Sequence, residues 1–379
     1  MDFELSEEAR MIQETARRFS ENELAPNAAE VDEKEIFPRE AWKKLSELGF
    51  AGLLTPEKYG GLGLDYVTMA AVMEELGKGC IATAGTYSVH LTTQFMVLKY
   101  GTEEQRLWLL PQMTSGEKIG ALALTEPNAG SDVSSMKSRA EPRNGRYLIN
   151  GTKIFITTAR EAEIYLVLAK TDPSLTHKGI STFIVEKGTH GFSFGKLEEK
   201  MGYRGSPTGE LVFTDCAVPV NQRLGREGTG FAMVMDGLDC GRLSVGALSL
   251  GIAQVAFDTA IKHVKGREQF GQSIGSFQGI QWMLSDMATE ISASRWLLYH
   301  AASLADKKKP FTKEASMAKC YATDTAMRVT TDAVQLFGGY GYIKEFPVER
   351  YMREAKIFQI VEGTNQIQRT IIARELLSA

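Results

Sequence analysis

One carboxylate near the C-terminus has the neighbours that a general base requires. Glu362 follows a mostly apolar run at residues 357–361 and directly precedes Gly363. Apolar neighbours such as Val361 keep water from a carboxylate and raise its basicity, while glycine lets the backbone approach a ligand closely. These residues suit a general base. A structural interpretation competes with this one, in which Glu362 lies before a helix capped by Thr364 and its charge favours the helix N-terminus.

Four further segments carry residues that could hold a ligand. They are ALTEPNAGSD at 123–132, KIFITT at 153–158, REQFG at 267–271 with a following Phe-Gln, and the glycine-rich GGYGY at 338–342. Small residues and hydroxyls in the first two could present backbone and side-chain hydrogen-bond donors. An arginine beside a helix break suits a phosphate group. Each also has a structural interpretation: an irregular loop, a sheet strand, or a surface arginine at a helix end.

Several common site motifs are absent from the sequence. No GxGxxG connects a strand to a helix and no GxxxxGK[ST] occurs, so neither a Rossmann turn nor a P-loop is indicated. The five histidines show no HExxH spacing, and no GxSxG is present. We therefore expect no metal site and no serine-hydrolase elbow.

The composition is that of an ordinary globular protein. Of 379 residues, 43% are hydrophobic and 24% charged, with a net charge of −4, which suggests no nucleic-acid partner. The four cysteines form no CxxC pair, which favours a reducing compartment. The acidic N-terminal stretch MDFELSEEA has no apolar segment typical of a signal peptide. No apolar run approaches the roughly 18 residues of a membrane span, so we expect a cytoplasmic protein without one.

These chemical residues must be positioned by three successive parts of the chain. Residues 1–118 have helical periodicity, with expected helices at 66–76, 82–100 and 103–114. The first helix is expected to end at Pro26 and the second to begin at Pro38.

Residues 119–229 show strand patterns instead. The pairs Asn144-Gly145 and Asn150-Gly151 are expected to be hairpin turns. Strands are expected at 146–149, 152–157, 164–169, 181–185 and 211–213.

Residues 230–379 return to helical periodicity. Thr312 is a plausible N-cap and Gly338 a plausible helix end. The fold class is therefore α+β, mostly α: an N-terminal helical domain, a central β domain and a C-terminal four-helix bundle.

In this order the segments resemble the acyl-CoA dehydrogenase family, over essentially the whole chain. The most specific matches are ALTEPNAGSD, MGYRGSPTGELVF, REQFGQSIGSFQ, QLFGGYGYIKEFPVERYMREAKI and EGTNQIQ. The resemblance implies the same three-part fold, the cofactor FAD, an acyl-CoA substrate and electron transfer to an electron-transferring flavoprotein. Members similar to butyryl-CoA dehydrogenase, acting on short, branched or alicyclic acyl groups, fit best.

The resemblance also implies which residues contact FAD. In the β domain they are Leu122, Leu124, Thr125, Ser131, Phe155 and Thr157. In the helical bundle they are Arg267, Gln269, Phe270, Gln278, Gln335, Gly338, Gly339, Thr364 and Gln366. In the family, residues of the 267–278 segment reach the ADP half of FAD from a neighbouring subunit, which implies an oligomer, usually a tetramer.

One FAD segment departs from the family pattern. The family commonly has Trp-Ile-Thr-Asn-Gly where this chain has Phe-Ile-Thr-Thr-Ala at 155–159. The aromatic residue and the central threonine are retained, so stacking is expected to remain. The last two residues differ, which puts the local loop shape in question.

The catalytic base implied by the resemblance is Glu362. Isovaleryl- and long-chain-type members carry their glutamate elsewhere, at the position occupied here by Gly241. The substrate-binding residues implied are Ser131, Leu238, Asp239, Arg242, Val361 and Gly363.

Val361 raises the question of the acyl group, because short- and medium-chain relatives commonly have tyrosine there. Loss of that ring favours a bulky substrate, such as a branched or cyclohexane-carboxyl group. Alternatively, Phe95 or Phe358 refills the space and the substrate is butyryl-CoA. The competing functions are an acyl-CoA oxidase and a non-catalytic protein that binds flavin or CoA thioesters.

Overall fold

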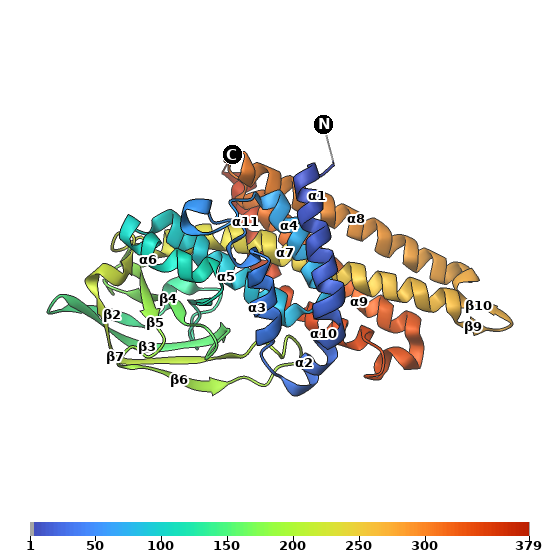
Figure 1. The fold of residues 1–379 in the computed structure, drawn as a ribbon, viewed down its shortest axis with the longest axis horizontal. Coiled ribbons are helices and arrows are strands. Elements are labelled where there is room, and N and C mark those ends of the chain that lie inside the picture. Colours follow the sequence, from blue (N-terminus) through green and yellow to red (C-terminus); the bar gives the residue numbers. More distant parts are fainter. Residues whose placement is uncertain (1–3, 379) are drawn as a thin grey trace.

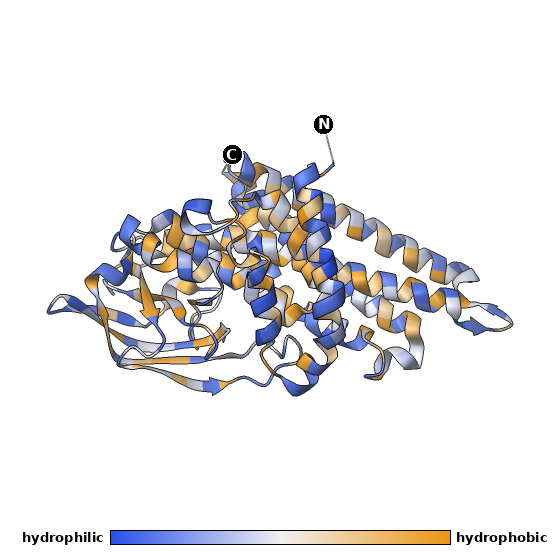
Figure 2. Cartoon of the chain, viewed as in Figure 1, coloured by the Kyte–Doolittle hydropathy of each residue, from blue (hydrophilic) through white to orange (hydrophobic). Residues whose placement is uncertain are grey.

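The computed structural model describes residues 4–378, in which a β domain is joined to two sets of helices (Figure 1). The N-terminal helices are α1 (Glu7–Phe19), α2 (Ala28–Lys34), α3 (Arg39–Glu47), α4 (Tyr66–Gly79), α5 (Ile81–Tyr100) and α6 (Glu103–Thr114). Apolar residues concentrate where the helices pack together in the middle of the molecule (Figure 2). The helical character expected for the N-terminal part is thus confirmed.

The expected end of the first helix at Pro26 is wrong. Helix α1 ends at Phe19, but the chain continues as a π-helical turn, Ser20–Leu24, and a 3-10 turn, Ala25–Asn27, before α2 begins. Pro26 lies in the first positions of the 3-10 turn. Proline is tolerated there because that N–H has no helical partner to lose. The second expectation holds, since α3 begins directly after Pro38.

The central domain is an eight-stranded sheet in the order β6-β7-β3-β2-β4-β5-β8, with β1 pairing β4 in parallel. Its strands are β1 (Gly120–Ala123), β2 (Arg139–Arg143), β3 (Arg146–Thr157), β4 (Ile164–Lys170), β5 (Ile180–Glu186), β6 (Phe192–Leu197), β7 (Thr208–Pro219) and β8 (Arg223–Leu224). All but the last residue of β4 are buried, as in a strand covered on both faces.

One of the two expected hairpin turns is confirmed and one is wrong. Asn144 and Gly145 both have positive φ, 51° and 75°, and connect β2 to β3. Asn150 and Gly151 instead lie inside β3, at a register shift against β7. The Asn150 amide hydrogen-bonds the side chain and backbone of Asp215 on β7, at 3.0 and 2.8 Å, so this asparagine stabilises strand pairing.

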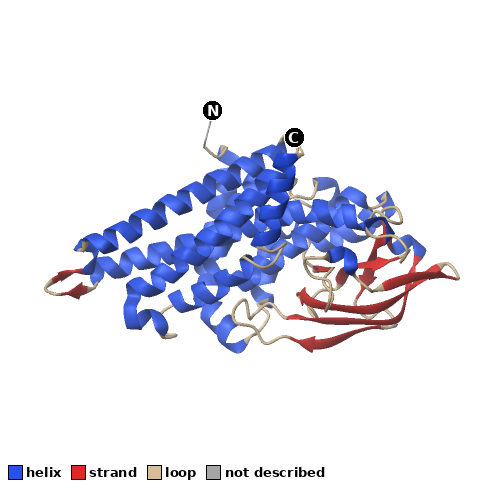
Figure 3. Ribbon diagram, turned by 180° about the vertical axis from the view of Figure 1, so that it is seen from behind, coloured by secondary structure: helices blue, strands red, loops and turns tan. Residues whose placement is uncertain are grey.

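The C-terminal helices are α7 (Gly230–Gly266), α8 (Gln278–Asp306), α9 (Thr312–Phe337), α10 (Val348–Phe358) and α11 (Asn365–Leu377). Between α7 and α8 a small hairpin, β9 (Glu268–Gln269) and β10 (Gln272–Ser273), lies at the opposite end of the molecule from the large sheet (Figures 1 and 3). The hairpin and the large sheet are therefore far apart within one chain.

Helix α7 is more apolar than expected, since the sequence was expected to contain no run long enough to span a membrane. It is the one helix within residues 4–378 that is long and apolar enough for a span, but 67% of its most apolar window is buried inside the protein. Helices α4, α5 and α9 pack against it. This is the pattern of a core helix.

The expected ends of α9 are half right. Gly338, with φ of 59°, ends the helix as predicted. Thr312 is the first residue of the helix rather than its N-cap, which is Phe311. The Thr312 hydroxyl instead donates a hydrogen bond of 2.6 Å to Asp239 Oδ2 on α7.

Candidate functional site

Glu362 lies in the turn between α10 and α11, in a conformation that few non-glycine residues adopt. Its φ is 56° and that of Gly363 is 85°. The Gln368 amide donates hydrogen bonds of 2.9 Å to the carbonyls of both residues. Thr364 is the N-cap of α11, with its hydroxyl accepting from the Ile367 N–H at 3.3 Å. The capping interpretation is therefore right for Thr364, while the backbone directs Glu362 elsewhere.

The Glu362 carboxylate approaches the backbone of α7. A Cβ placed on Gly241 would lie 2.6 Å from Glu362 Oε2, so the glutamate side chain could keep this position only beside a glycine. Oε2 is itself buried and has no hydrogen-bond partner within the described chain. A buried carboxylate oxygen without a partner is expected where a ligand supplies the missing contact.

Burial raises the pKa of Glu362 to about 7, against the attraction of Arg242 and Lys319, which lowers it. The expected source of that burial was the apolar run before Glu362. This is wrong in part, because Ile360 is 50% exposed, whereas Val361 is partly buried against the main hydrophobic core. Packing against α7 therefore contributes what Ile360 does not.

The expected substrate residues on α7 form a buried polar group. Arg242 is buried and pairs with Asp239, whose other oxygen accepts from Thr312. Burial raises the pKa of the Asp239 carboxyl, and Arg242 opposes the shift. The Arg242 Nε is buried and lacks a partner in the described chain. Leu238, one turn away, joins an apolar cluster with Leu122 and Leu124.

Lys319 on α9 is fully buried beside the same turn. Its Nζ donates hydrogen bonds of 2.9 Å to the Gly363 carbonyl and to Asn365 Oδ1. Burial lowers the pKa of Lys319 to about 8, and the Glu362 charge opposes that shift. Sequence reasoning missed this residue, although it lies beside Ala318 in the alanine-rich stripe whose burial the periodicity indicated.

The expected FAD residues of the β domain lie around the ends of β1 and β3. Thr125 follows β1, and its carbonyl accepts from the Ile154 N–H at 2.9 Å. Phe155 lies at a register shift of β3 with φ of 56°, and its ring is 58% exposed. A bulge of this kind redirects a side chain out of the sheet. Thr157 ends β3, and Ser131 is exposed in the loop after β1.

A buried ion pair that the sequence reasoning did not assign fixes this loop. Lys153 Nζ lies 2.8 Å from Glu126 Oε1 and 3.1 Å from the Leu124 carbonyl. Glu126 also accepts from the backbone N–H groups of Lys137 and Ser138, at 2.6 and 3.0 Å. Both charged residues lie inside motifs that carried the resemblance, which was the signal available.

The departure from the family pattern after Phe155 has a structural consequence. Thr158 has φ of 64°, and its hydroxyl is buried without a partner in the described chain. Asparagine tolerates this left-handed region, whereas a β-branched residue is strained there. The loop after Phe155 therefore carries local strain at Thr158.

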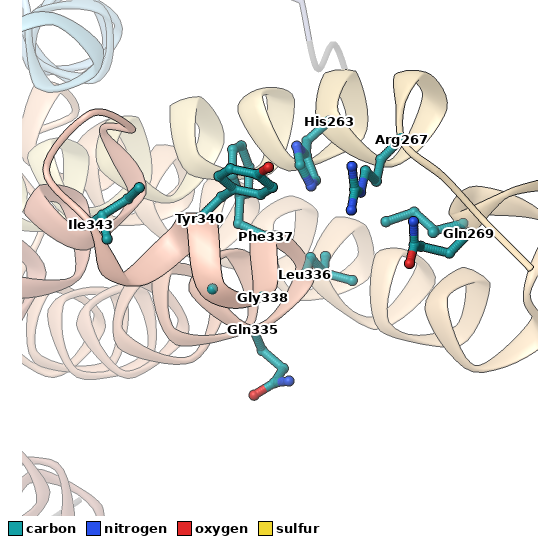
Figure 4. A pocket seen from close by; sticks show the side chains of 11 residues that line it. His263, Arg267, Gln269, Gln335, Leu336, Phe337, Gly338, Tyr340 and Ile343 are labelled. Carbon is teal, nitrogen blue, oxygen red and sulfur yellow. The ribbon is translucent and has the colours of Figure 1, made fainter.

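A second group of expected FAD residues lines a cavity of about 440 Å³ at the far end of the bundle (Figure 4). The expected residues that line it are Arg267, Gln269, Gln335, Gly338 and Gly339. His263 and Tyr340, which were not expected, also line it. The Arg267 guanidinium lies 5.6 Å from the centre of the Tyr340 ring.

Four expected residues do not line this cavity. Phe270, at the tip of the hairpin, is 92% exposed, and Gln278 is exposed at the start of α8. Thr364 and Gln366 lie at the start of α11, beside Glu362. Within one chain, the expected FAD residues of the β domain and those lining the Arg267 cavity therefore form two separate groups. The cavity lies at the end of the molecule away from the sheet (Figure 1).

Three family models together match nearly the whole chain. The acyl-CoA dehydrogenase N-terminal, middle and C-terminal domains match residues 6–117, 121–216 and 228–377. The chain belongs to the acyl-CoA dehydrogenase family.

Two characterised members of the acyl-CoA dehydrogenase family resemble the chain over its length. The acryloyl-CoA reductase (NADH) of Anaerotignum propionicum is 47% identical, covering 100% of this chain and 96% of the reductase. The short-chain specific acyl-CoA dehydrogenase of Clostridium acetobutylicum is 46% identical, covering 99% of this chain and 100% of that enzyme.

Solved structures give the same family. The butyryl-CoA dehydrogenase of Megasphaera elsdenii is 45% identical with a TM-score of 0.98, covering 100% of both chains. A chain in the structure of an electron transferring flavoprotein of Acidaminococcus fermentans is 49% identical with a TM-score of 0.98, again covering both chains fully. The FAD complex of PigA is 34% identical with a TM-score of 0.96, covering 99% of each chain.

No group of three or more His, Cys, Asp or Glu side chains within residues 4–378 could hold a metal ion.

Proposed function

We propose that this enzyme is a FAD-dependent acyl-CoA dehydrogenase in which Glu362 removes the α proton of a short acyl-CoA. The observation that carries the proposal is the Glu362 carboxylate itself. It is held against α7 by a left-handed backbone, has a buried oxygen without a partner in the described chain, and has a pKa raised by burial to about 7. A base with a pKa near the working pH is suited to proton abstraction.

The residues present fit FAD. The exposed Phe155 ring, with Thr125 and Thr157 nearby, offers an apolar face and hydroxyls for the ring system. The cavity beside Arg267 offers a cation and a glycine-rich backbone for a pyrophosphate. When bound, FAD supplies the acceptor for the hydride that leaves the β carbon.

The protein's own residues then remove the α proton and stabilise the charge that develops. Glu362 takes the α proton, and its backbone N–H, by family resemblance, donates to the thioester carbonyl and stabilises developing negative charge there. Asp239, Arg242 and Leu238 are proposed to hold the acyl-CoA chain, with Ser131, Val361 and Gly363 near the thioester. The product is a trans-2-enoyl-CoA.

We further propose that each FAD is held by two subunits of a homotetramer. The support is the separation within one chain of the β-domain residues from the Arg267 cavity, together with Phe270, which is 92% exposed. Aromatic residues are enriched at interfaces between protein chains, which is consistent with Phe270 contacting a second chain. The three parts, 1–118, 119–229 and 230–379, are proposed to be the N-terminal helical domain, the central β domain and the C-terminal helical bundle of each subunit.

For the acyl group of the substrate, we propose only its size and shape. The relatives named for short-chain and butyryl substrates favour a short acyl chain. Val361 in place of tyrosine favours a branched or alicyclic group, such as cyclohexane-carboxyl. Phe358 is buried in the main core, and Phe95 packs in the cluster of Leu238. Steady-state rates over butyryl-, isobutyryl- and cyclohexane-carboxyl-CoA decide, since a clear butyryl preference contradicts the bulky-substrate proposal.

The electron partner is proposed to be an electron-transferring flavoprotein, supported by the likeness to a chain solved with one. A cytoplasmic location is supported by the free, buried state of all four cysteines.

The likeness to an acryloyl-CoA reductase favours a second candidate, the reverse reaction that reduces a 2-enoyl-CoA. Rates with acryloyl-CoA and a reduced electron-transferring flavoprotein, against rates of propionyl-CoA oxidation, separate the two directions.

The base is tested with Glu362→Gln. Anaerobic addition of butyryl-CoA bleaches the wild-type flavin, and the variant is expected to bind substrate but leave the flavin oxidised. Glu345→Gln, at an exposed glutamate of the preceding loop, is the matched control and bleaches normally. Bleaching by Glu362→Gln at the wild-type rate contradicts the assignment. Peroxide release during aerobic turnover favours an oxidase, and a wild type that binds acyl-CoA without bleaching favours a non-catalytic protein.

A further inference from the structure

The turn that carries Glu362 is held from outside by one buried lysine. Lys319 belongs to α9, and its ammonium group reaches across to the turn, donating at 2.9 Å to the Gly363 carbonyl and at 2.9 Å to Asn365 Oδ1. Asn365 is fixed in turn by Thr323 and Asp324, at 2.8 and 2.7 Å. The lysine therefore connects α9 to the residues on the C-terminal side of the base.

Such a connection is needed because the turn is strained. Glu362 and Gly363 are consecutive residues with positive φ, of 56° and 85°. A non-glycine residue in that region persists only where its surroundings hold it. Gln368 supplies neutral hydrogen bonds to the carbonyls of both residues, and Lys319 supplies the charged one.

The charge of Lys319 is also available to Glu362. Lys319 makes no ion pair within the described residues, and its hydrogen-bond partners are a carbonyl and an amide. Arg242, the other cation near Glu362, is engaged by Asp239. A buried cation whose hydrogen-bond partners are neutral acts on nearby carboxylates with little screening, and of the charges acting on Lys319 that of Glu362 has the largest effect.

We propose that Lys319 is a positioning residue for the base, fixing the turn through the Gly363 carbonyl and favouring the ionised form of the Glu362 carboxylate. This inference rests on the proposed function of Glu362.

The ionisable groups around the pair set the expected direction. Facing Glu362 are Arg242 from α7, Lys319 from α9 and Tyr203 from the loop before β7. Facing Lys319 are Glu362, Cys320, Arg242 and Asp324. Removing the Lys319 charge leaves burial opposed by Arg242 alone, so the pKa of Glu362 rises.

The test compares Lys319→Met with Gln368→Met in the FAD-loaded enzyme. Both remove hydrogen bonds to the Gly363 carbonyl, but only the first removes a charge. The pH dependence of kcat/KM reports ionisation in the free enzyme. We expect the acid limb to move to higher pH by about one unit in Lys319→Met, on the scale of an opposite charge beside a carboxyl. In Gln368→Met the rate falls but the limb stays in place.

The proposal is overturned if the acid limb of the kcat/KM profile stays in place in Lys319→Met. It is also overturned if the limb moves equally in Lys319→Met and Gln368→Met. Lys319→Gln, which retains a donor without the charge, is the second neutral variant and is expected to show the same shift. Failure of both neutral variants to fold assigns Lys319 to stability alone and likewise overturns it. Proton abstraction by Glu362→Gln at the wild-type rate would instead contradict the proposed function, whatever Lys319→Met shows.

Discussion

At the scale of single residues, the site depends on a close contact between Glu362 and Gly241. By the family resemblance, isovaleryl- and long-chain-type members carry their catalytic glutamate at the position of Gly241, and here that position lies against the carboxylate of Glu362. Two backbone positions far apart in the sequence thus deliver a carboxylate to the same space. The two cannot both carry large side chains, because one would occupy the place of the other.

Gly241→Ala is therefore expected to displace the base. The added methyl group would lie 2.6 Å from Glu362 Oε2, and the flexible end of the glutamate would move to relieve it. We expect kcat to fall by roughly ten- to a hundred-fold, as for a misplaced reacting group, with little change in melting temperature. Gly246→Ala on the same helix is the control, since its nearest atom is Leu298 Cδ1 at 3.3 Å. Equal effects of the two variants would contradict the argument.

The raised pKa of Glu362 also predicts a dependence of stability on pH. A carboxyl with a pKa of about 7 when folded and 4.5 when unfolded retains its proton longer in the folded state. The wild type then loses stability as pH rises from about 4.5 through 7. Glu362→Gln removes this pH-dependent loss, and at pH 8 its free energy of unfolding is expected to exceed that of the wild type by about 1–3 kcal/mol. Urea unfolding at pH 5 and pH 8 measures the difference, which should be small at pH 5.

At the scale of elements, the loop after β1 is joined to β3 by a buried ion pair. Lys153 is 0% exposed and Glu126 is 6% exposed. Their pairing fixes the loop that carries Thr125 toward the proposed flavin face. An isolated sheet would not need this pair, whereas a loop that must hold one shape against a cofactor does.

Lys153→Met is expected to leave Glu126 as an unpaired buried charge. We expect a loss of about 3–5 kcal/mol in unfolding free energy and a measurable loss of bound FAD on gel filtration. The double variant Lys153→Met with Glu126→Gln should regain much of the stability, because the unpaired charge is gone. A double variant no more stable than Lys153→Met would show that the pairing does not determine the loss.

The strained end of β3 gives a prediction of opposite sign. Thr158→Asn places a residue that tolerates positive φ where a β-branched one stands. We expect stabilisation of about 0.5–1 kcal/mol, seen as a raised melting temperature. Thr157→Asn, one residue earlier and outside the left-handed region, is the control and should not stabilise.

At the scale of the whole molecule, the two groups of expected FAD residues lie in different regions of one chain. The sheet and the β9–β10 hairpin are at opposite ends (Figures 1 and 3). A single chain has the residues near Phe155 proposed to face the flavin ring and, elsewhere, the cavity beside Arg267. In the proposed homotetramer, a neighbouring subunit would bring its own cavity to the first group.

Subunit complementation tests this arrangement. Phe155→Ala and Arg267→Ala are each expected to bind FAD weakly, because each damages one half of every site. Unfolded and refolded together, they should form mixed oligomers in which some sites combine an intact β domain with an intact cavity. FAD binding and activity above those of either parent are expected. A mixture no better than its parents would place both halves in one chain.

The sequence by itself determined the helical, β, helical order, which follows from local periodicity. The choice of Glu362 as candidate base and of the segments expected to contact FAD came from motifs and the family resemblance that they carry. Both are properties of neighbouring residues. Only the tertiary structure decided that Gly241 touches the carboxylate, that Lys319 holds the turn, and that Lys153 pairs with Glu126. Such contacts join residues distant in the chain, and packing between elements selects them. Asn150-Gly151 and Pro26 show the same limit, because cross-strand pairing and a continuing helix outweighed their local turn and stop signals.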